Sequence, residues 1–199
     1  MKTETPNKSE RTRQFIIEKT APIFNTKGYA GTSISDITAA TKLTKGSIYG
    51  NFKNKDEVAI SVFKFNLHKL QLMIAKEQSS KKTAKEKLLC FPELYLHFLS
   101  EKFPVGGCPI MNTAIEADDT HPQLKEIAKK AILAWNDNLI YLINKGKEQN
   151  EFKTTTIAEE KALLIIALIE GTVMLIKLTG RTDHLKSLMN SLKALIEDL

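Results

Sequence analysis

Apolar side chains recur every three or four residues along most of this 199-residue chain. That spacing places them on one face of a helix, whereas the alternation of apolar and polar residues that is typical of strands is almost absent. Helix-capping residues, prolines and glycines divide the pattern into about nine segments. The pattern therefore predicts an all-α fold of about nine helices.

The N-terminal part of the pattern consists of a long helix, two short ones and a second long one. The first three are predicted at about 9–27, 33–40 and 44–51. The fourth starts at Asn54, which forms the pattern of a capping box with Glu57 three residues later. Five further helices are predicted beyond it, at about 83–99, 109–117, 122–149, 156–180 and 183–196, with Thr83 and Glu86, Thr156 and Glu159, and Asp183 as caps.

The helix predicted at 156–180 is apolar nearly all round, so each of its sides has to be covered. Packing within one chain is one solution. The other is a homodimer, in which the last two helices of each chain form a four-helix interface about a twofold axis. We favour the dimer. The predicted interface residues are Leu164, Leu168, Leu175, Leu188, Leu192 and Leu195.

Composition adds an uneven charge to this picture. The chain carries a net charge of +6, with 42% hydrophobic and 26% charged residues, as is ordinary for a soluble globular protein. Residues 1–56 hold ten Lys/Arg against five Asp/Glu, a net of +5, and the remainder hold nineteen against eighteen, a net of +1. This distribution indicates a nucleic-acid-binding head on a neutral body, although a basic solvated surface is the alternative.

We expect a cytoplasmic protein. The N-terminus is polar, as a signal peptide is not, and the longest apolar run, 162–169, is too short to cross a membrane and is ended by Glu170. No Ser-His-Asp arrangement, phosphate loop or close carboxylate pair occurs, and no two of the four histidines have metal-ligand spacing. We therefore expect no enzymatic activity, no metal and no cofactor. His121, near Asp118 and Asp119, is predicted to lie in a solvated loop.

The two cysteines are expected to be reduced thiols, because no CxxC pair occurs. Cys90 is predicted to lie in the core. Cys108 follows two glycines and precedes a predicted helix, whose dipole would favour a thiolate. It is either a sensor of oxidants or electrophiles or a small side chain buried at a tight turn, and we favour the buried side chain.

Residues 33–52 have the pattern of a helix-turn-helix, with two short helices joined by a tight turn at 41–43. The second helix turns a polar face away from the small aliphatic core that the two helices share. Hydroxyl, amide, phenolic and cationic groups on such a face contact phosphates and base edges, and a helix fits the major groove. The predicted contacts on this helix are Thr44, Lys45, Gly46, Ser47, Tyr49 and Asn51, with Gly46 allowing a close backbone approach.

Groups around this helix extend the predicted DNA surface. Free backbone amides at helix starts near Thr32, Ser33 and Asn54 can hold phosphates. Lysines add positive charge at the rim, where phosphates would pass. These rim lysines are Lys42, Lys53 and Lys55.

The run FNTKGYAGTSISDITAATKLTKGSIYGNFKNKDEV, residues 24–58, resembles the DNA-binding domain of the TetR (tetracycline-repressor-type) family. The likeness covers about residues 10–70. It is carried by Gly28-Tyr29, by Thr32-Ser33-Ile34, by Lys45-Gly46-Ser47-Ile48-Tyr49, and by Phe52 followed by Lys55-Asp56-Glu57. On this resemblance Phe52 is counted with the DNA-binding residues. The runs GGCPIMNTAIEADDTHP and EGTVMLIKLTG resemble a subset of the same family more loosely.

The resemblance implies a DNA-binding domain over 1–53 and a helical ligand-binding and dimerisation domain over 54–199. It also implies a bacterial protein that binds a palindromic operator as a homodimer. Such a protein is most often a repressor that a small molecule releases by moving the helix that starts at Asn54. Two positions depart from the family pattern. Lys42 replaces a glycine that is frequent at the turn, and would cost about 1 kcal/mol more than Gly in a left-handed conformation. Gly50 offers no side-chain contact and puts Asn51 in doubt as a base-reading residue.

The effector is expected to be a largely apolar small molecule, because aromatic and methionine side chains recur through the middle of the second domain. Asn112 and Glu116 are further polar groups that could orient it. Alternatives to a ligand-released repressor are an activator, a redox sensor using Cys108, and a helical binding domain with a non-specific DNA-binding head. The predicted pocket residues are Phe63, Asn66, Leu67, Phe91, Tyr95, Phe98, Met111, Ile115, Trp135 and Met174.

Overall fold

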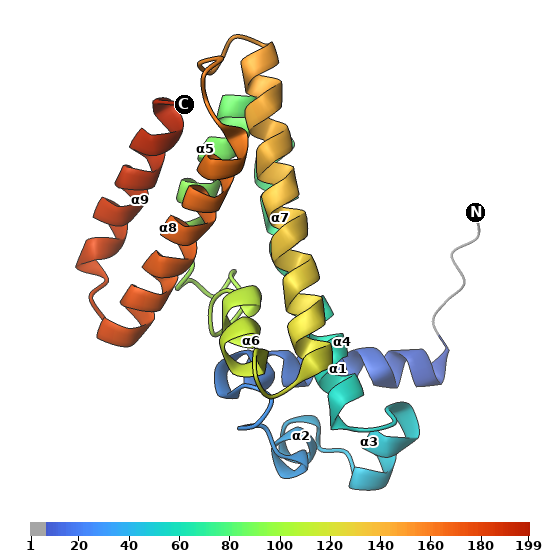
Figure 1. Cartoon of the computed structure of the whole chain (residues 1–199). Coiled ribbons are helices and arrows are strands. Elements are labelled where there is room, and N and C mark those ends of the chain that lie inside the picture. The colour runs from blue at the N-terminus through green and yellow to red at the C-terminus, as the bar shows by residue number, and fades with distance from the viewer. Residues whose placement is uncertain (1–6) are drawn as a thin grey trace. The chain divides into compact units, whose positions relative to one another are not determined.

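The computed structural model of the protein describes residues 7–199 and folds them into nine helices, drawn in Figure 1. This part of the chain contains no strand, and the prediction of an all-α fold is confirmed. The helices are α1 (Lys8–Lys27), α2 (Ile34–Thr41), α3 (Lys45–Asn51), α4 (Lys55–Gln78), α5 (Ala84–Tyr95), α6 (Pro109–Ala117), α7 (Pro122–Glu148), α8 (Ala158–Thr179) and α9 (Asp183–Glu197).

The chain divides into two compact units. Unit 1 contains the described residues up to Lys69 together with Pro104–Ile127, and unit 2 contains Leu70–Phe103 together with Ala128–Leu199. The helices α4 and α7 each begin in unit 1 and continue into unit 2. The division predicted at residue 53 separates α1 to α3 from the rest, whereas unit 1 also contains α4 as far as Lys69, all of α6 and the start of α7.

Unit 1 is organised around α1, α2 and α3. Capping boxes start the first two of these helices: Asn7 with Glu10 for α1, and Ser33 with Asp36 for α2. Because apolar residues repeat at helical spacing, the three helices turn their apolar faces toward one another. The core that they form with α4, α6 and α7 includes Ile16, Phe24, Ile37, Ile48, Phe52, Val58, Val62, Ala117 and Leu124.

In unit 2, α9 packs against α5 and α8, and Figure 1 shows α8 and α9 side by side. The buried residues of α9 are Leu185, Met189, Leu192 and Ile196, which form one stripe along the helix. Leu192 is 0% exposed and faces its own chain, so its prediction as a dimer-interface residue is wrong. The sequence gives α9 two adjacent apolar stripes, and its spacing does not distinguish the stripe that packs within the chain.

Two predicted helix ends differ from the structure. Thr156 does not cap α8, because its hydroxyl donates a hydrogen bond to the backbone carbonyl of Leu199, and α8 has no side-chain cap. The helix α5 ends at Tyr95 rather than near residue 99, shortly after Pro92, which has no N–H to donate. The capping box of Thr83 and Glu86 at the start of α5 is confirmed.

The helix α8 is the one helix of the described residues that is long and apolar enough, by length and composition, to cross a membrane. The mean hydropathy of its most apolar 18-residue segment is 2.1, and only 39% of that segment is buried within the chain. The expectation that no segment crosses a membrane rested on the longest uninterrupted apolar run, 162–169, whereas the whole of α8 meets the requirement of length and composition. A large apolar face of α8 is consequently exposed in the single chain.

Candidate DNA-binding interface

The turn between α2 and α3 holds the helix-turn-helix in shape. Lys42 ends α2 in the left-handed region, at φ 58° and ψ 20°, which is the conformation that a glycine adopts at lower cost. Thr44 then caps α3, and its hydroxyl accepts a hydrogen bond from the backbone N–H of Ser47 at 3.1 Å. Because Ile48 is fully buried on one side of α3, the opposite side of this helix faces solvent.

The solvent face of α3 carries the polar residues expected for DNA recognition. Thr44, Lys45, Gly46 and Tyr49 are exposed, Ser47 is half-buried, and Lys42 and Lys53 are exposed at the two ends of the helix. The Lys45 ammonium lies 5.9 Å from the centre of the Tyr49 ring, so a cation and a phenol share this face. No side chain lies within 4 Å of a Cβ built on Gly50. The face therefore presents hydroxyls, a phenol and positive charge to a partner outside the protein.

Two residues predicted to contact DNA are instead buried. Thr32 is fully buried, and its hydroxyl donates to the carbonyl of Gly28 at 2.6 Å, where it fastens the turn after α1. Phe52 is 2% exposed and lies in the core beneath the Arg13 guanidinium, 4.0 Å from the ring centre. The prediction of Phe52 as a DNA contact is wrong, because a family motif records residues that shape the domain together with residues that touch DNA. The backbone N–H of Thr32, predicted to hold a phosphate, instead donates to the carbonyl of Tyr29 at 3.3 Å.

Two further predicted contacts are occupied inside the protein. The Asn51 side chain donates to the carbonyl of Ser47 at 2.9 Å and accepts from the Ser9 hydroxyl at 3.2 Å. The Lys55 ammonium donates to the carbonyls of Tyr29 and Thr32, at 2.9 and 3.1 Å, and lies 4.0 Å from the Tyr29 ring centre. These two side chains therefore hold α3 and the start of α4 in place, and their polar groups are already engaged in hydrogen bonds within the protein.

Carboxylates near the helix-turn-helix are neutralised by internal partners. The Lys27 ammonium and the Ser33 N–H and hydroxyl hold the pKa of Asp36 well below its usual range. The backbone N–H of Lys53, followed by the Arg13 guanidinium, lowers the pKa of Glu57. The negative charges of Asp36 and Glu57 are thus matched within the unit, and the exposed Lys42, Lys45 and Lys53 give the face of α3 a positive field.

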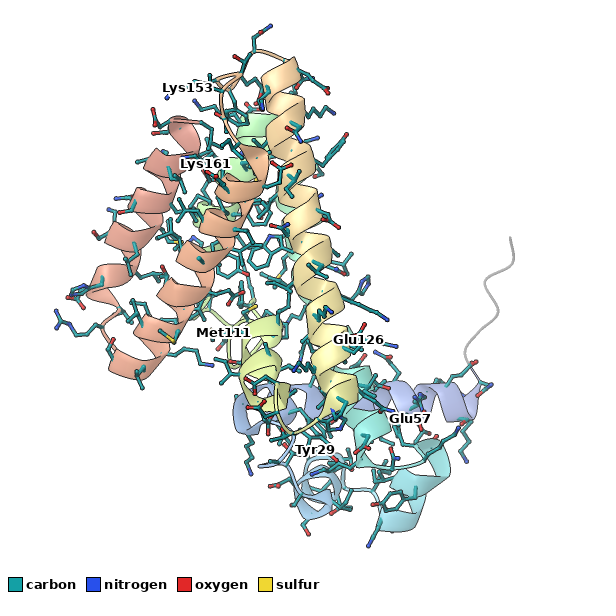
Figure 2. The ribbon with its side chains drawn as sticks, in the orientation of Figure 1. Tyr29, Glu57, Met111, Glu126, Lys153 and Lys161 are labelled. Carbon is teal, nitrogen blue, oxygen red and sulfur yellow. The ribbon has the colours of Figure 1, made fainter. Side chains whose placement is uncertain are left out.

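Arg13 was not singled out by the sequence analysis, although it joins three helices. Its guanidinium donates to the carbonyl of Asn51 at 2.6 Å, to the Glu57 carboxylate at 2.7 Å and to the Ser61 hydroxyl at 3.2 Å. Figure 2 labels Glu57 on the first turns of α4. The sequence around Arg13 is polar, and this role could not be predicted from it because all of the hydrogen-bond partners of Arg13 lie about 40 residues away.

The loop after α1 is fastened by α6. The Glu116 carboxylate accepts hydrogen bonds from the backbone N–H groups of Tyr29 and Ala30, at 2.6 and 2.7 Å. The Asn112 amide donates to the carbonyls of Asn25 and Gly106, at 3.0 and 2.9 Å. Both polar groups therefore hold α6 to the DNA-binding helices, which is a different role from the ligand orientation considered for them from the sequence.

Gly28 is required by this arrangement. Its φ of +73° lies in the region that favours glycine, and a Cβ built on it would lie 2.3 Å from the Glu116 carboxylate. A side chain at this position would therefore push α6 away from the end of α1.

A second set of contacts links the starts of α4 and α7 through Tyr29, which Figure 2 labels. The Tyr29 hydroxyl donates to the Asp56 carboxylate, and this hydrogen bond is the main reason that the Tyr29 pKa rises to about 12. The His121 ring packs edge-on against Tyr29 at 4.5 Å, and its Nε2 lies 3.7 Å from Asp56. The prediction of His121 in a solvated loop is therefore wrong, because its partners come from the head.

The ten predicted pocket residues fall into two groups, one in each unit. In unit 1, Phe63 and Asn66 line a small cavity of about 30 Å³, which suits a water molecule rather than an effector. Leu67 and Met111 are half-buried, and Ile115 is exposed. The Asn66 amide donates to the carbonyl of Ala21 at 3.2 Å, so it is engaged with α1.

In unit 2, the predicted pocket residues form an aromatic cluster. Trp135 stacks on Phe91 and Tyr95, with ring centres 6.1 and 6.4 Å apart, and Phe103 joins from the following segment. Phe98 packs against Phe103. Met174 is exposed on α8. Trp135 of α7 is thus brought to Phe91 and Tyr95 of α5, about 40 residues earlier in the chain. Phe103, which was predicted only as part of a loop, also belongs to this cluster.

Both cysteines are buried free thiols. Burial raises the pKa of the Cys90 thiol, as expected for a core residue. Cys108 precedes α6 and is 0% exposed, in a turn where Gly106 and Gly107 both have positive φ. The small buried side chain is the interpretation that this geometry favours over the redox sensor. Within residues 7–199, no group of three His, Cys, Asp or Glu side chains could hold a metal ion.

Comparisons with known proteins show the family of the chain. Residues 16–62 match the family model for bacterial regulatory proteins of the tetR family, and residues 84–192 match the tetracyclin repressor-like C-terminal domain. Together they define a helix-turn-helix transcription regulator with a separate C-terminal helical domain. The chain belongs to the TetR family, and the prediction of a DNA-binding transcription regulator that is not an enzyme is confirmed.

Three relatives illustrate the range of the family. A TetR-family regulator from Cytophaga hutchinsonii has a TM-score of 0.93 and 46% identity, with 97% of this chain and 96% of that chain covered. The HTH-type transcriptional repressor DhaR of Mycobacterium sp. (strain GP1) is 24% identical over 173 residues, 87% of this chain and 86% of DhaR. FadR of Bacillus subtilis, solved with stearoyl-CoA, has a TM-score of 0.74 and 22% identity, with 92% and 96% covered; that likeness shows the fold alone.

Proposed function

We propose that the protein is a cytoplasmic homodimeric repressor that binds a palindromic operator and is released from it by a largely apolar small molecule. The observation that carries the proposal is the solvent face of α3. Lys45 and Tyr49 are exposed on this face, opposite the buried Ile48, and Lys42 and Lys53 are exposed beside them. A repressor among the relatives, DhaR, supports the direction of regulation.

The dimer is supported by the exposed apolar face of α8. Leu164, Leu168, Gly171, Leu175 and Leu178 follow one another at intervals of four and three residues, which is the spacing of a helix–helix seam. Nothing lies within 4 Å of a Cβ built on Gly171, so the middle of the stripe is open to a close approach. The half-buried Leu188 and Leu195 of α9 lie seven residues apart and extend the surface. A second copy of the same face would cover it about a twofold axis.

The effector proposal rests on the aromatic cluster of unit 2. The indole Nε1–H of Trp135 and the Oδ1 of Asn136 are buried without a hydrogen-bond partner among the described residues, and a buried polar group without a partner is costly. A ligand with an apolar body and a few polar atoms could pack on the rings and satisfy these groups. In the complex of FadR with stearoyl-CoA, the stearoyl chain of the ligand is an apolar body of this kind.

The coupling between effector and DNA is proposed to run along α4 and α7, the helices that continue from one unit into the other. Their first turns are tied to the DNA-binding helices by Arg13, Tyr29 and His121. A change in either helix would therefore move unit 1 as a body and alter the spacing of the two α3 helices. The effector releases DNA only if it binds the DNA-incompetent arrangement more tightly.

Replacing Lys45 by alanine tests the proposed interface. Fluorescence anisotropy would compare the wild-type protein and Lys45→Ala on DNA flanking its gene and on scrambled DNA, over a range of salt concentrations. We expect wild-type binding that prefers the flanking DNA, and a salt slope that falls by about 1 in the variant because one phosphate contact is lost. Lys129→Ala, an exposed lysine of α7 in unit 2, is the matched control and should leave the slope unchanged. Equal, weak binding of the wild type to both DNAs would contradict specific recognition.

A further inference from the structure

A shallow groove lies beside the helix-turn-helix, on the side where the turn before α3 meets the first turns of α1. It is lined by Lys8, Arg11, Thr12, Phe15 and Leu43 and has a volume of about 390 Å³. Phe15 is 38% exposed and Leu43 is half-buried. The groove therefore has an apolar floor and a polar rim, and the sequence analysis assigned it no role.

The rim carries uncompensated positive charge. Lys8 and Arg11 are exposed, and neither forms an ion pair with any residue from 7 to 199. Other cations of unit 1 are engaged internally: Arg13 with Glu57, Lys27 with Asp36, and Lys55 with backbone carbonyls. A groove that combines two free cations with an apolar floor suits a partner that is anionic at one end and apolar at the other.

The groove is continuous with the DNA-binding face. Leu43, on its floor, directly precedes Thr44, the residue that caps α3. A nucleic-acid strand that passes the N-terminus of α3 would therefore reach the groove without leaving the protein surface. The backbone of DNA has the required chemistry, since each phosphate is flanked by the carbon face of a deoxyribose.

We propose that this groove binds a phosphate–deoxyribose unit of the operator backbone, outside the base pairs that α3 reads. The Lys8 ammonium and the Arg11 guanidinium hold the phosphates, and Phe15 with Leu43 supports the sugar. The Thr12 hydroxyl donates to the backbone carbonyl of Lys8 at 2.9 Å and so fixes the first turn of α1 beside the groove. The contact is with the backbone alone, so it raises affinity for every DNA sequence equally and positions the head. The inference rests on the proposed operator binding.

The test uses the full chain and the double variant Lys8→Ala/Arg11→Ala. Its dissociation constants for operator and scrambled duplexes are measured by anisotropy at several salt concentrations. Each lost phosphate contact reduces the slope of log K against log salt by about 0.9, so we expect a slope lower by about 1.8. Binding to both duplexes should weaken by the same factor, and the preference for the operator should stay unchanged. The control is Lys64→Ala/Lys129→Ala, which removes two exposed lysines from α4 and α7.

A second measurement locates the contact on the DNA. Neutral methylphosphonates replace single phosphates of the operator, and those that flank the α3 site should weaken wild-type binding but leave the Lys8→Ala/Arg11→Ala variant unaffected. An unchanged salt slope, or equal methylphosphonate effects in both proteins, would overturn the inference and leave the groove to another anionic partner. If Lys45→Ala still lowers the slope in that case, the groove proposal alone has failed. If the wild type does not prefer its operator, the proposed function has failed.

Discussion

Replacing Leu175 by glutamate should convert the protein to monomers and weaken its binding to operator DNA by at least about 100-fold. Leu175 is 45% exposed in the single chain and lies in the middle of the seam that α8 presents. In the proposed dimer each new carboxylate would be buried and would face its symmetry mate. An uncompensated buried charge costs about 3–5 kcal/mol, and about 1.4 kcal/mol corresponds to a tenfold change in affinity.

The measurement is sedimentation equilibrium for the oligomeric state, followed by operator binding of the same sample. Leu99→Glu is the matched control, because Leu99 is 55% exposed in unit 2 and lies outside α8. This variant should remain a dimer and keep its operator affinity. A Leu175→Glu protein that stays dimeric would place the dimer interface on another surface. A Leu175→Glu protein that is soluble in the presence of lipid and insoluble in its absence would instead point to a membrane role for α8.

Replacing Phe52 by alanine should lower the free energy of unfolding by about 3–5 kcal/mol. Phe52 is almost completely buried between α1, α3 and α4, and the Arg13 guanidinium lies over its ring. The substitution removes a large part of the core of unit 1 and leaves a cavity. Urea unfolding followed by circular dichroism would give the change, and loss of operator binding would follow from loss of the fold.

Tyr49→Ala is the counterpart that separates folding from recognition. Tyr49 is an aromatic residue three positions before Phe52, but it is 41% exposed on the solvent face of α3. Its removal should change the free energy of unfolding by less than about 0.5 kcal/mol, as is usual for surface positions, while weakening operator binding. If Phe52→Ala were as stable as the wild type and lost only DNA binding, Phe52 would be a DNA contact after all.

Local rules were sufficient for the elements of the fold. Capping residues such as Ser33, Thr44, Asn54 and Thr83 act on backbone groups three residues away, so their effects can be predicted from short stretches of sequence. The polar face of α3 could be predicted for the same reason, since helical periodicity separates Ile48 from Lys45 and Tyr49. The left-handed Lys42 was found at the turn where the family pattern has glycine.

Roles that depend on distant partners could not be predicted in this way. Glu116 meets backbone groups more than 80 residues away, and His121 meets Asp56 and Tyr29, so neither has a local signature. Thr32 and Phe52 belong to a family motif, which does not separate structural residues from those that contact DNA. Leu192 shows the corresponding limit for apolar residues, because spacing reveals a stripe but not the surface that covers it.

The central claim, release from the operator by an apolar effector in unit 2, is tested most directly by following Trp135 and DNA binding together. Trp135 is the single tryptophan of the chain and lies in the aromatic cluster, so its emission reports on that site alone. The complex with fluorescently labelled operator would be titrated with long-chain acyl-CoAs, fatty acids and planar aromatic compounds. The account predicts a compound that changes Trp135 emission saturably and releases the DNA with the same midpoint. Release of DNA with no change at Trp135, or no release by any apolar compound, would contradict it.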